Sequence, residues 1–365
     1  MKIIFSAGGT GGHIFPAIAV ADELKRQIPN AEILFVGANG KMEMERIPTA
    51  GYRIEGLNIV GFQRKFSLKN IWQNLKLPFK ILDSMRTVRR ILKDFKPDVA
   101  VGFGGFASGP TLRAAAQMSI PTILQEQNSY AGVTNKILAK KAQVICVAYE
   151  GLEKYFPVEK IVLTGNPVRS DIINVTTKRA EGLSHFKLDG TKKTIFVSGG
   201  SLGARTLNKC IEYNAIFFKQ HTDIQVIWQC GKVHYESLKN CEAAQLPNIN
   251  LMPFVQRMDL AYAVADIVIA RAGALTVSEL CLVGVPTILV PSPNVAEDHQ
   301  TKNALALSKK NAAILMRDDE AVEKTLSMVL DIFSDANLSQ SLKENILKLG
   351  KPNAAKDIVN TILRY

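Results

Sequence analysis

Residues 2–13 read KIIFSAGGTGGH, and residues 193–204 read KTIFVSGGSLGA. In both stretches a short aliphatic run is followed at once by a glycine cluster, and a helical pattern comes next. A buried strand, a glycine turn and a helix in this order are typical of the start of a doubly wound α/β domain. Because the order occurs twice at matching spacing, we predict two such domains in the 365 residues.

The rest of the chain continues the alternation of apolar runs with helical patterns. Further runs are EILFVG, DVAVGFG, PTILQE, QVICVA and KIVLTG in the first half, and IQVIWQC, ADIVIAR, PTILVP and AAILM in the second. Near-continuous apolar strands between helices predict parallel sheets covered on both faces. We therefore predict an α/β fold of two Rossmann-like, doubly wound parallel-sheet domains that face a ligand-binding cleft.

Composition along the chain suggests where the domains begin and end. Residues 1–168 are predicted to form the N-terminal domain and residues 193–345 the C-terminal domain. Residues 169–192 lose the apolar periodicity, so we predict a linker there. Residues 346–365 carry a final helical pattern, which we expect to pack back on the N-terminal domain.

Overall composition excludes several classes of protein. A hydrophobic content of 47% with 21% charged residues is that of a globular chain rather than a disordered or fibrous one. No run of about 18 apolar residues occurs, and the N-terminal apolar run is too short for a signal peptide, so we expect neither a membrane span nor export. The five cysteines are never spaced C-x-x-C, which predicts reduced thiols rather than disulfides or a zinc site.

The net charge of +12 favours an anionic partner, whether nucleic acid, a membrane surface or a phosphorylated substrate. Much of this charge lies in residues 62–93, where nine cations and a single acid, Asp83, are interleaved with apolar side chains. That composition is typical of a segment lying on an anionic bilayer, although a core helix with a lysine-rich outer face would also fit. No DNA or RNA motif occurs, so we predict no nucleic-acid partner. The predicted membrane contacts are Phe66, Ile71, Trp72, Leu75, Phe79, Arg64, Lys65, Lys69, Lys76 and Lys80.

Glycine-rich loops follow four of the predicted strands, at residues 8–13, 102–110, 199–204 and 271–276. Glycine lets backbone N–H groups approach a ligand, and the next helix N-terminus adds the positive end of its dipole. Any single loop of this kind could be an ordinary strand-to-helix turn. Four of them in one chain favour the binding of phosphate or diphosphate groups.

A dinucleotide site is an alternative at one of these loops. The first loop departs from the G-x-G-x-x-G pattern because Ile14 takes the place of the third glycine. In the second loop Gly102, Gly104 and Ala107 fit the pattern. Glu126 ends the next strand at a suitable distance, so a dinucleotide site stays open there. No loop continues as Gly-Lys-Ser/Thr, which excludes a P-loop NTPase.

Seven motifs carry a resemblance to a known family. They are GGTGGH (8–13), GFGGFASGP (102–110), QEQN (125–128), GNPVR (165–169), GGSLGAR (199–205), RAGALTVSE (271–279) and EDHQTKNA (297–304). In this order they closely resemble the MurG family of bacterial N-acetylglucosaminyltransferases, in glycosyltransferase family 28. The resemblance implies a glycosyltransferase B-type fold, with a membrane-bound acceptor on the N-terminal domain and UDP-N-acetylglucosamine (UDP-GlcNAc) mainly on the C-terminal domain.

The resemblance also implies a reaction and a location. GlcNAc would pass from UDP-GlcNAc, with inversion, to the C4 hydroxyl of MurNAc in undecaprenyl-diphosphate-MurNAc-pentapeptide, which converts lipid I to lipid II in peptidoglycan synthesis. Such an enzyme would be peripheral, at the cytoplasmic face of the plasma membrane. Proteins of cell-wall synthesis and division would be its partners.

Family positions that bind the donor match residues on both predicted domains. Glu279 is expected to accept both ribose hydroxyls as a bidentate carboxylate, and Val255 to frame the uracil through its backbone. Asn128 and Gln300 are expected to contact the sugar, and His299 leaves open whether a second side chain shares that contact. The full predicted donor set is Thr10, Gly11, Gly12, Asn128, Arg169, Ser201, Val255, Ala274, Leu275, Thr276, Val277, Ser278, Glu279 and Gln300.

The acceptor side needs a base and a diphosphate seat. His13 is the first candidate base because its unperturbed pKa of about 6.5 suits neutral pH, although it could instead bond a phosphate or cap the helix. Glu126 is the second candidate. No Asp-x-Asp occurs, so we expect no metal or other cofactor, and Arg169, Ser201 and helix N-termini would neutralise the leaving UDP. The acceptor diphosphate is expected at Gly8, Gly9, Gly104, Gly105 and Ser108.

Two other functions remain open. A UDP-GlcNAc 2-epimerase has a similar two-domain fold and would act without any acceptor. A non-catalytic nucleotide-sugar-binding protein docked on the membrane would bind UDP-GlcNAc without turnover.

Overall fold

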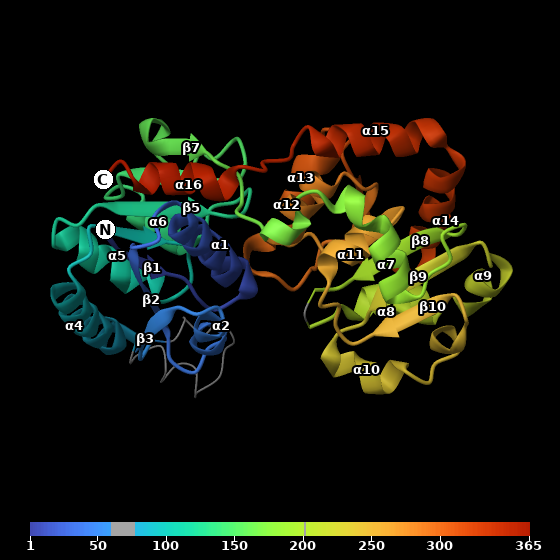
Figure 1. Cartoon of the computed structure of the whole chain (residues 1–365), viewed down its shortest axis with the longest axis horizontal. Coiled ribbons are helices and arrows are strands. Elements are labelled where there is room, and N and C mark those ends of the chain that lie inside the picture. The colour runs from blue at the N-terminus through green and yellow to red at the C-terminus, as the bar shows by residue number, and fades with distance from the viewer. Residues whose placement is uncertain (60–76, 201) are drawn as a thin grey trace. The chain divides into compact units, whose positions relative to one another are not determined.

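The computed structural model describes residues 1–59, 77–200 and 202–365 (Figure 1). The chain divides into two compact units: unit 1 is Met1–Val168 with Asn353–Tyr365, and unit 2 is Arg169–Pro352. Each unit contains one parallel sheet, of seven strands in unit 1 and six in unit 2. The predicted α/β class with two parallel-sheet domains is confirmed.

The parallel strands of unit 1 are ordered β3-β2-β1-β4-β5-β6-β7. The direction in which strands are added to the sheet switches between β1 and β4. A switch of this kind leaves the loops that follow its two central strands side by side at the carboxyl edge of the sheet. The loops at 8–13 and 102–110 follow those two strands. The strands are β1 (Lys2–Ser6), β2 (Glu32–Ala38), β3 (Arg53–Leu57), β4 (Val99–Gly102), β5 (Thr122–Glu126), β6 (Val144–Val147) and β7 (Ile161–Leu163).

Helices cover both faces of this sheet because alternate strand residues point to opposite sides. Ile3 and Phe5 belong to one core cluster, and Ile4 belongs to the other. The first cluster includes side chains of α1 and α16, and the second includes those of α4 and α5. The helices are α1 (Gly11–Gln27), α2 (Glu43–Thr49), α4 (Leu77–Phe95), α5 (Ser108–Gln117), α6 (Val133–Leu138), the 3₁₀ turn η1 (Val158–Lys160) and α16 (Ala354–Ile362).

Unit 2 repeats this plan with the strand order β10-β9-β8-β11-β12-β13. Here the direction of strand addition switches between β8 and β11, the two strands that precede the third and fourth glycine loops. The strands are β8 (Lys193–Ser198), β9 (Ile224–Gln229), β10 (Ile249–Met252), β11 (Ile267–Ala270), β12 (Thr287–Leu289) and β13 (Ile314–Leu315). The helices are α7 (Arg179–Phe186), α8 (Arg205–Glu212), α9 (Ala215–Gln220), α10 (Lys232–Leu238), α11 (Met258–Val264), α12 (Ala274–Val283), α13 (His299–Ser308), α14 (Ala321–Ser334) and α15 (Ala336–Leu347), with 3₁₀ turns η2 (Ser170–Ile172), η3 (Val175–Lys178), η4 (Ala243–Gln245) and η5 (Ala296–Asp298).

The segment predicted as a linker, residues 169–192, is instead part of unit 2. It forms η2, η3 and α7, and both η3 and α7 pack on α11. Its anchors are a few buried side chains, Ile172, Val175 and Phe186, which are too sparse to produce an apolar period. Arg179 Nη1 also donates to Val264 O at 3.0 Å. The unit therefore begins at Arg169 rather than at residue 193.

The end of the chain differs from the prediction in its boundary. Helix α15 and the residues up to Pro352 stay with unit 2, whereas Asn353–Tyr365 belong to unit 1. The apolar side of α16 packs on α1, with Ile358, Val359 and Ile362 fully buried.

Two further observations concern the membrane and the thiols. None of the described helices combines the length and apolar character that a membrane crossing needs. Four of the five cysteines are buried thiols, and Cys241 is half-buried.

Candidate active site

The first two glycine loops of unit 1 touch through their backbones. Gly104 and Gly105 have φ values of +95° and +88°, which favour glycine. A side chain on Gly105 would overlap the backbone of Gly8, and one on Gly104 would lie 3.0 Å from the His13 ring. The structure therefore brings together four predicted site residues from segments about ninety positions apart in the sequence.

His13 lies in the first turn of α1, and its ring has a defined orientation. The Nδ1 atom is 2.8 Å from the carbonyl oxygen of Gly8 and 3.4 Å from the Thr10 hydroxyl. A carbonyl can only accept, so Nδ1 carries the hydrogen and the lone pair of the neutral ring is at Nε2. This is the form of imidazole that a general base needs. Thr10 precedes the helix, and Gly11 and Gly12 are its first two residues.

Gly9 does not offer its amide to a phosphate as predicted. Its N–H donates to Oε2 of Glu43 at 3.0 Å, and Oε1 of the same carboxylate accepts from Ala38 N at 3.0 Å. Glu43 is fully buried under the loop. Sequence analysis missed Glu43 because an acid in the first turn of a short helix is common on protein surfaces.

Ser108, a predicted diphosphate contact, has a buried hydroxyl that is not hydrogen-bonded to any described residue. It is the first residue of α5, and it is fully buried. A buried hydroxyl at a helix N-terminus is suited to a phosphate oxygen, which would accept its hydrogen.

Glu126, the second candidate base, has both carboxylate oxygens occupied. Oε2 accepts from Gly132 N at 2.9 Å and from Asn135 Nδ2 at 2.8 Å, while Oε1 accepts from Asn128 N at 3.2 Å. The residue is 2% exposed. These contacts make Glu126 the organiser of the loop that carries Asn128, so the structure does not support a role as base.

Three buried amides join the second glycine loop to the GNPVR segment. Gln127 Nε2 donates to Phe103 O at 2.7 Å, Gln125 Nε2 donates to Asn166 Oδ1 at 2.9 Å, and Asn166 Nδ2 donates to Gln127 O at 2.9 Å. No role was predicted for the two glutamines. A buried network with this many bonds holds both loops in one arrangement.

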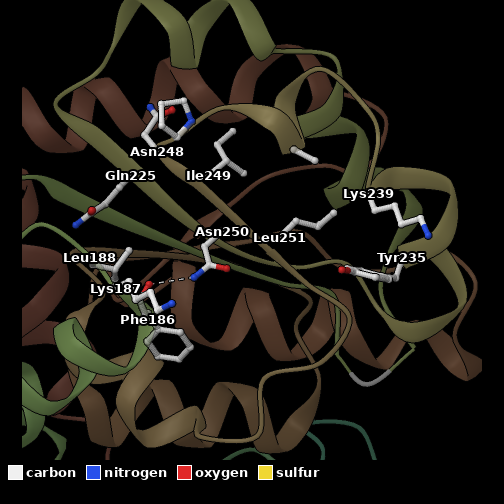
Figure 2. A pocket seen from close by; sticks show the side chains of 12 residues that line it. Phe186, Lys187, Leu188, Gln225, Tyr235, Lys239, Asn248, Ile249, Asn250 and Leu251 are labelled. Atoms are coloured by element: carbon white, nitrogen blue, oxygen red, sulfur yellow. Dashed lines mark hydrogen bonds between the residues drawn. The ribbon is translucent and has the colours of Figure 1, made fainter.

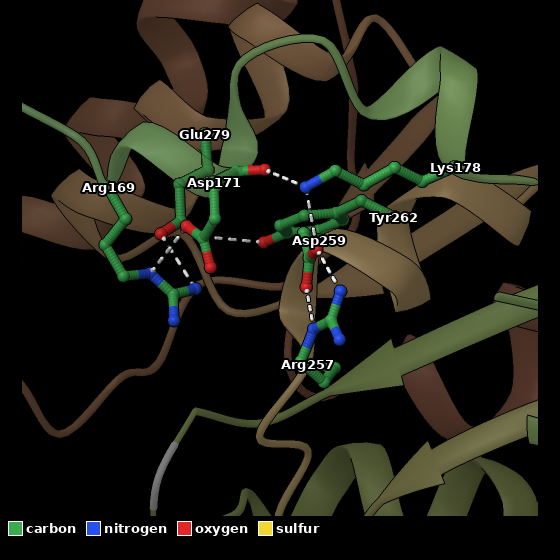
Figure 3. Close-up of polar contacts among 7 residues, drawn as sticks. All are labelled: Arg169, Asp171, Lys178, Arg257, Asp259, Tyr262 and Glu279. Atoms are coloured by element: carbon green, nitrogen blue, oxygen red, sulfur yellow. Dashed lines mark hydrogen bonds and ion pairs between the residues drawn. The ribbon is translucent and has the colours of Figure 1, made fainter. Parts of the chain in front are cut away.

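In unit 2 the carboxylate of Glu279 lies between a cation and a phenol (Figure 3). Arg169 Nη2 is 3.5 Å from Oε1, and the Tyr262 hydroxyl donates to Oε2 at 2.9 Å. Burial raises the pKa of Glu279, whereas Arg169 and the Tyr262 hydrogen bond lower it. Each carboxylate oxygen keeps a second lone pair that a ribose hydroxyl could reach.

Tyr262 was missed by sequence analysis. It lies on α11 and is 2% exposed, and in the sequence it is one more apolar position of a core-facing helix. Glu279 and the other predicted residues 274–278 form the N-terminal part of α12, whose preceding residue, Gly273, is extended.

A second carboxylate in the same view holds the segment after Arg169 on α11 (Figure 3). Asp259 accepts from Arg257 Nε at 2.9 Å and from Lys178 Nζ at 2.8 Å. The Asp259 side chain is 1% exposed. The Arg257 bonds first, and then Lys178, lower the pKa of Asp259 well below its usual range.

Val255 and Gln300 are each held by a bond that sequence analysis did not foresee. Val255 N donates to Gln229 Oε1 at 2.8 Å, so only its carbonyl is left to frame a base. Gln229 Nε2 also donates to Gly200 O at 3.0 Å, which joins Val255 to the third glycine loop. Gln300 Oε1 accepts from Ser292 N at 2.9 Å, so its carboxamide nitrogen is the group suited to a sugar oxygen.

Several predicted residues lie outside the described residues. These are Ser201 and the membrane contacts Arg64, Lys65, Phe66, Lys69, Ile71, Trp72, Leu75 and Lys76. Phe79 and Lys80 lie in the first turn of α4. Among the described residues, no three His, Cys, Asp or Glu side chains gather as metal ligands.

A cavity of about 400 Å³ lies beside the edge strand β10 (Figure 2). Lys187, Tyr235, Lys239 and Asn250 are among its lining residues. None of the predicted site residues lines it.

Comparison with known families gives two matches along the chain. The glycosyltransferase family 28 N-terminal domain matches residues 3–147, and the family 28 C-terminal domain matches residues 194–362. The matches fall on unit 1 and unit 2 respectively, apart from the last helix.

Full-length relatives narrow the assignment. A UDP-N-acetylglucosamine--N-acetylmuramyl-(pentapeptide) pyrophosphoryl-undecaprenol N-acetylglucosamine transferase of Flavobacterium psychrophilum is 52% identical over 363 residues, covering 100% of this chain and 97% of that protein. The transferase of the same name from Bacteroides thetaiotaomicron is 50% identical over 366 residues, with 100% and 97% covered.

Solved structures agree with these relatives. The crystal structure of Acinetobacter baumannii MurG matches with a TM-score of 0.79 at 31% identity, covering 100% of this chain and 99% of that one. A UDP-GlcNAc 2-epimerase from Neisseria meningitidis matches with a TM-score of 0.69 at 16% identity, covering 100% of both chains, which shows a shared fold alone. The chain therefore belongs to glycosyltransferase family 28 and, within it, to the MurG-type N-acetylglucosaminyltransferases.

Proposed function

We propose that this chain transfers GlcNAc from UDP-GlcNAc to the C4 hydroxyl of MurNAc in undecaprenyl-diphosphate-MurNAc-pentapeptide, forming lipid II and releasing UDP. The observation that carries the proposal is the identity of 52% and 50%, over the whole chain, to relatives named for this transfer. The site geometry supports it with an imidazole oriented by the Gly8 carbonyl in unit 1 and a buried carboxylate in unit 2.

In the proposed reaction, Nε2 of neutral His13 accepts the proton of the C4 hydroxyl. The C4 oxygen bonds to the anomeric carbon of GlcNAc from the side opposite the diphosphate, and the bond from that carbon to the phosphate oxygen breaks. UDP leaves with the electron pair, so the anomeric carbon is inverted. A positioned base of this kind contributes about 10²–10⁴-fold to a rate.

Residues of unit 2 are proposed to bind UDP and to neutralise its growing charge. The N-terminus of α12 and the Arg169 guanidinium would face the diphosphate, and Glu279 would accept the ribose hydroxyls. Val255 O and Gln300 Nε2 are the groups left for the uracil and the sugar. Thr10, Gly11, Gly12, Asn128 and Ser201 complete the proposed donor contacts.

Residues of unit 1 are proposed to bind the acceptor diphosphate. The buried hydroxyl of Ser108 and the N-terminus of α5 supply the donors, and Gly104 and Gly105, which pack closely on His13 and Gly8, line the proposed seat. Gly8 completes the proposed seat, whereas Gly9 shapes it rather than donating to it, because its amide already donates to Glu43.

We also propose that the protein binds the cytoplasmic face of the plasma membrane as a peripheral protein. Support comes from the acceptor's lipid tail, the net charge of +12 and the basic, apolar composition of residues 62–93.

The test is transfer of labelled GlcNAc from UDP-GlcNAc to a short-chain lipid-diphosphate-MurNAc-pentapeptide analogue, in the presence of EDTA. We expect transfer by the wild type, a loss of at least about 100-fold in His13→Asn, and a comparable loss in Glu279→Ala. Asparagine can still donate to Gly8 O but has no basic nitrogen, so His13→Asn removes the base and keeps the contact. His185→Asn, at an exposed position of α7, is the matched control and should keep full activity.

Other results would point to other functions. Loss of activity in EDTA that returns with added metal would contradict the metal-independent mechanism. Binding of UDP-GlcNAc with no transfer would favour a non-catalytic protein. Scrambling of the C2 configuration without an acceptor would identify a UDP-GlcNAc 2-epimerase.

A further inference from the structure

The side chain of Glu43 lies under the first glycine loop, in space left by two glycines that have no side chain there. Side chains on Gly8 or Gly37 would overlap Glu43, so both positions are glycine where the carboxylate passes. Glu43 is fully buried, and its two oxygens accept from two different segments: Oε1 from Ala38 N at the end of β2, and Oε2 from Gly9 N. A buried carboxylate with both oxygens bonded to backbone amides holds those amides firmly in place.

The same loop sets the ring of His13. Gly8, the residue before the clamped amide of Gly9, accepts from His13 Nδ1 at 2.8 Å. Gly8 is also confined from the other side by the backbone of Gly105. The carbonyl that selects the histidine tautomer is thus held between a buried carboxylate and the second glycine loop.

We propose that Glu43 is a positioning residue for His13. It clamps Gly8–Gly9, and the Gly8 carbonyl then keeps the hydrogen of His13 on Nδ1 and the lone pair on Nε2. Glu43 acts through the backbone and touches neither substrate. The effect of Glu43 on the His13 tautomer does not depend on the proposed function. Its effect on the transfer rate does, because that effect requires His13 to be the base.

The substitution Glu43→Gln tests this clamp with little change in size. A carboxamide presents one acceptor and one donor, so it cannot accept from both Gly9 N and Ala38 N. Either Gly9 N–H or Ala38 N–H would then face the NH₂ group of the new carboxamide, two donors with no acceptor between them, and the loop must shift. Glu45→Gln, exposed and two residues along the same helix, makes the same chemical change outside the clamp and is the matched control.

The first readout is ¹⁵N NMR of the histidine rings in the full chain, with the His13 signals assigned by their loss in His13→Asn. In the wild type at a pH where the ring is neutral, we expect the hydrogen on Nδ1. In Glu43→Gln we expect the population with the hydrogen on Nε2 to rise, and in Glu45→Gln we expect the wild-type spectrum. A wild-type His13 protonated on Nε2 overturns the proposal, even where Glu43→Gln fails to fold. A folded Glu43→Gln protein with the wild-type tautomer overturns it as well.

The second readout is transfer kinetics. We expect kcat to fall about ten- to a hundredfold in Glu43→Gln, because a small misplacement of a reacting group has an effect of this size, while KM for UDP-GlcNAc stays within about twofold of the wild-type value. A changed tautomer with unchanged kcat would support the clamp and contradict the role of His13 as base. A rise in KM for UDP-GlcNAc with normal kcat and normal tautomer would overturn the clamp.

Discussion

Tyr262 donates its hydroxyl hydrogen to Glu279 Oε2 at 2.9 Å and is itself almost wholly buried. This bond stabilises the charged form of Glu279 against the burial that raises its pKa. Only the charged carboxylate can accept both ribose hydroxyls, so affinity for UDP should fall as the pH drops through the raised pKa of Glu279.

The substitution Tyr262→Phe should therefore weaken UDP binding about tenfold near neutral pH, because a hydrogen bond to a charged group is lost. The pKa of Glu279 should rise further, so the acid loss of affinity should begin at a higher pH than in the wild type. Isothermal titration calorimetry with UDP over a pH series measures both effects, and Tyr213→Phe, at an exposed tyrosine, is the control. If UDP affinity falls over the same pH range in Tyr262→Phe as in the wild type, this role for Tyr262 is contradicted.

Asp259 contributes to stability rather than to substrate binding. Arg257 and Lys178 hold its folded pKa below the usual value of about 3.9, so its contribution is present above that pH and is lost as the pH falls through the lower folded pKa. Asp259→Asn should destabilise unit 2 by about 2 kcal/mol at pH 7. Thermal unfolding should show this difference shrinking below about pH 4. Asp319→Asn, in an exposed pair with Arg317, should cost less than about 1 kcal/mol, and an equal loss in both variants would contradict the prediction.

At the scale of elements, the strand, turn and helix order was predictable because each step has a local signal. Apolar runs mark the strands, and glycine clusters mark the turns at their carboxyl ends. Helix α7 and the 3₁₀ turns before it were missed because their few buried side chains follow no period. Their stability comes from packing on α11 and from bonds such as that of Arg179 to Val264 O.

Helix α16 adds the last part of the chain to a core formed by the first part, so its packing should contribute to the stability of unit 1. Ile358 is fully buried against α1 and the sheet. Ile358→Ala should lower the free energy of unfolding by about 2–5 kcal/mol, measured by thermal or denaturant unfolding. Asn360→Ala, on the exposed side of the same helix, should change it by less than about 0.5 kcal/mol. If the two variants unfold alike, the docking of α16 does not contribute to the core.

At the scale of the whole molecule, the net charge of +12 predicts salt-sensitive attraction to anionic lipid. Changing Lys65, Lys69, Lys76 and Lys80 to glutamine should reduce binding to anionic vesicles at least about tenfold, because each cation near such a surface contributes up to about 1 kcal/mol. Vesicle sedimentation of the full chain measures this, and four exposed lysines of unit 2 changed in the same way are the control: Lys187, Lys232, Lys239 and Lys309. Equal binding by the two variants would contradict the assignment of the basic segment to the membrane.

Much of the candidate site could be placed from the sequence because its residues follow glycine turns. Gly104, Ser108, His13 and Glu279 lie between two and nine residues after the end of a strand, at the edge where a parallel sheet gathers its functional groups. Their motifs identified the family. The roles of individual atoms could not be assigned in this way. Gly9 N and Val255 N already donate to side chains outside their own motifs. Both oxygens of Glu126 accept from the loop that follows it.

By itself, the sequence determined the fold class, the two-fold repetition of the plan and the position of the glycine loops, because these depend on local patterns of polarity and backbone freedom. Only the tertiary structure decided which groups hold the site in place. Glu43 reaches Gly9 across 34 positions, and Tyr262 reaches Glu279 across 17. A buried polar contact of this kind is formed when packing excludes water and leaves one available partner, and that partner has no fixed distance along the chain.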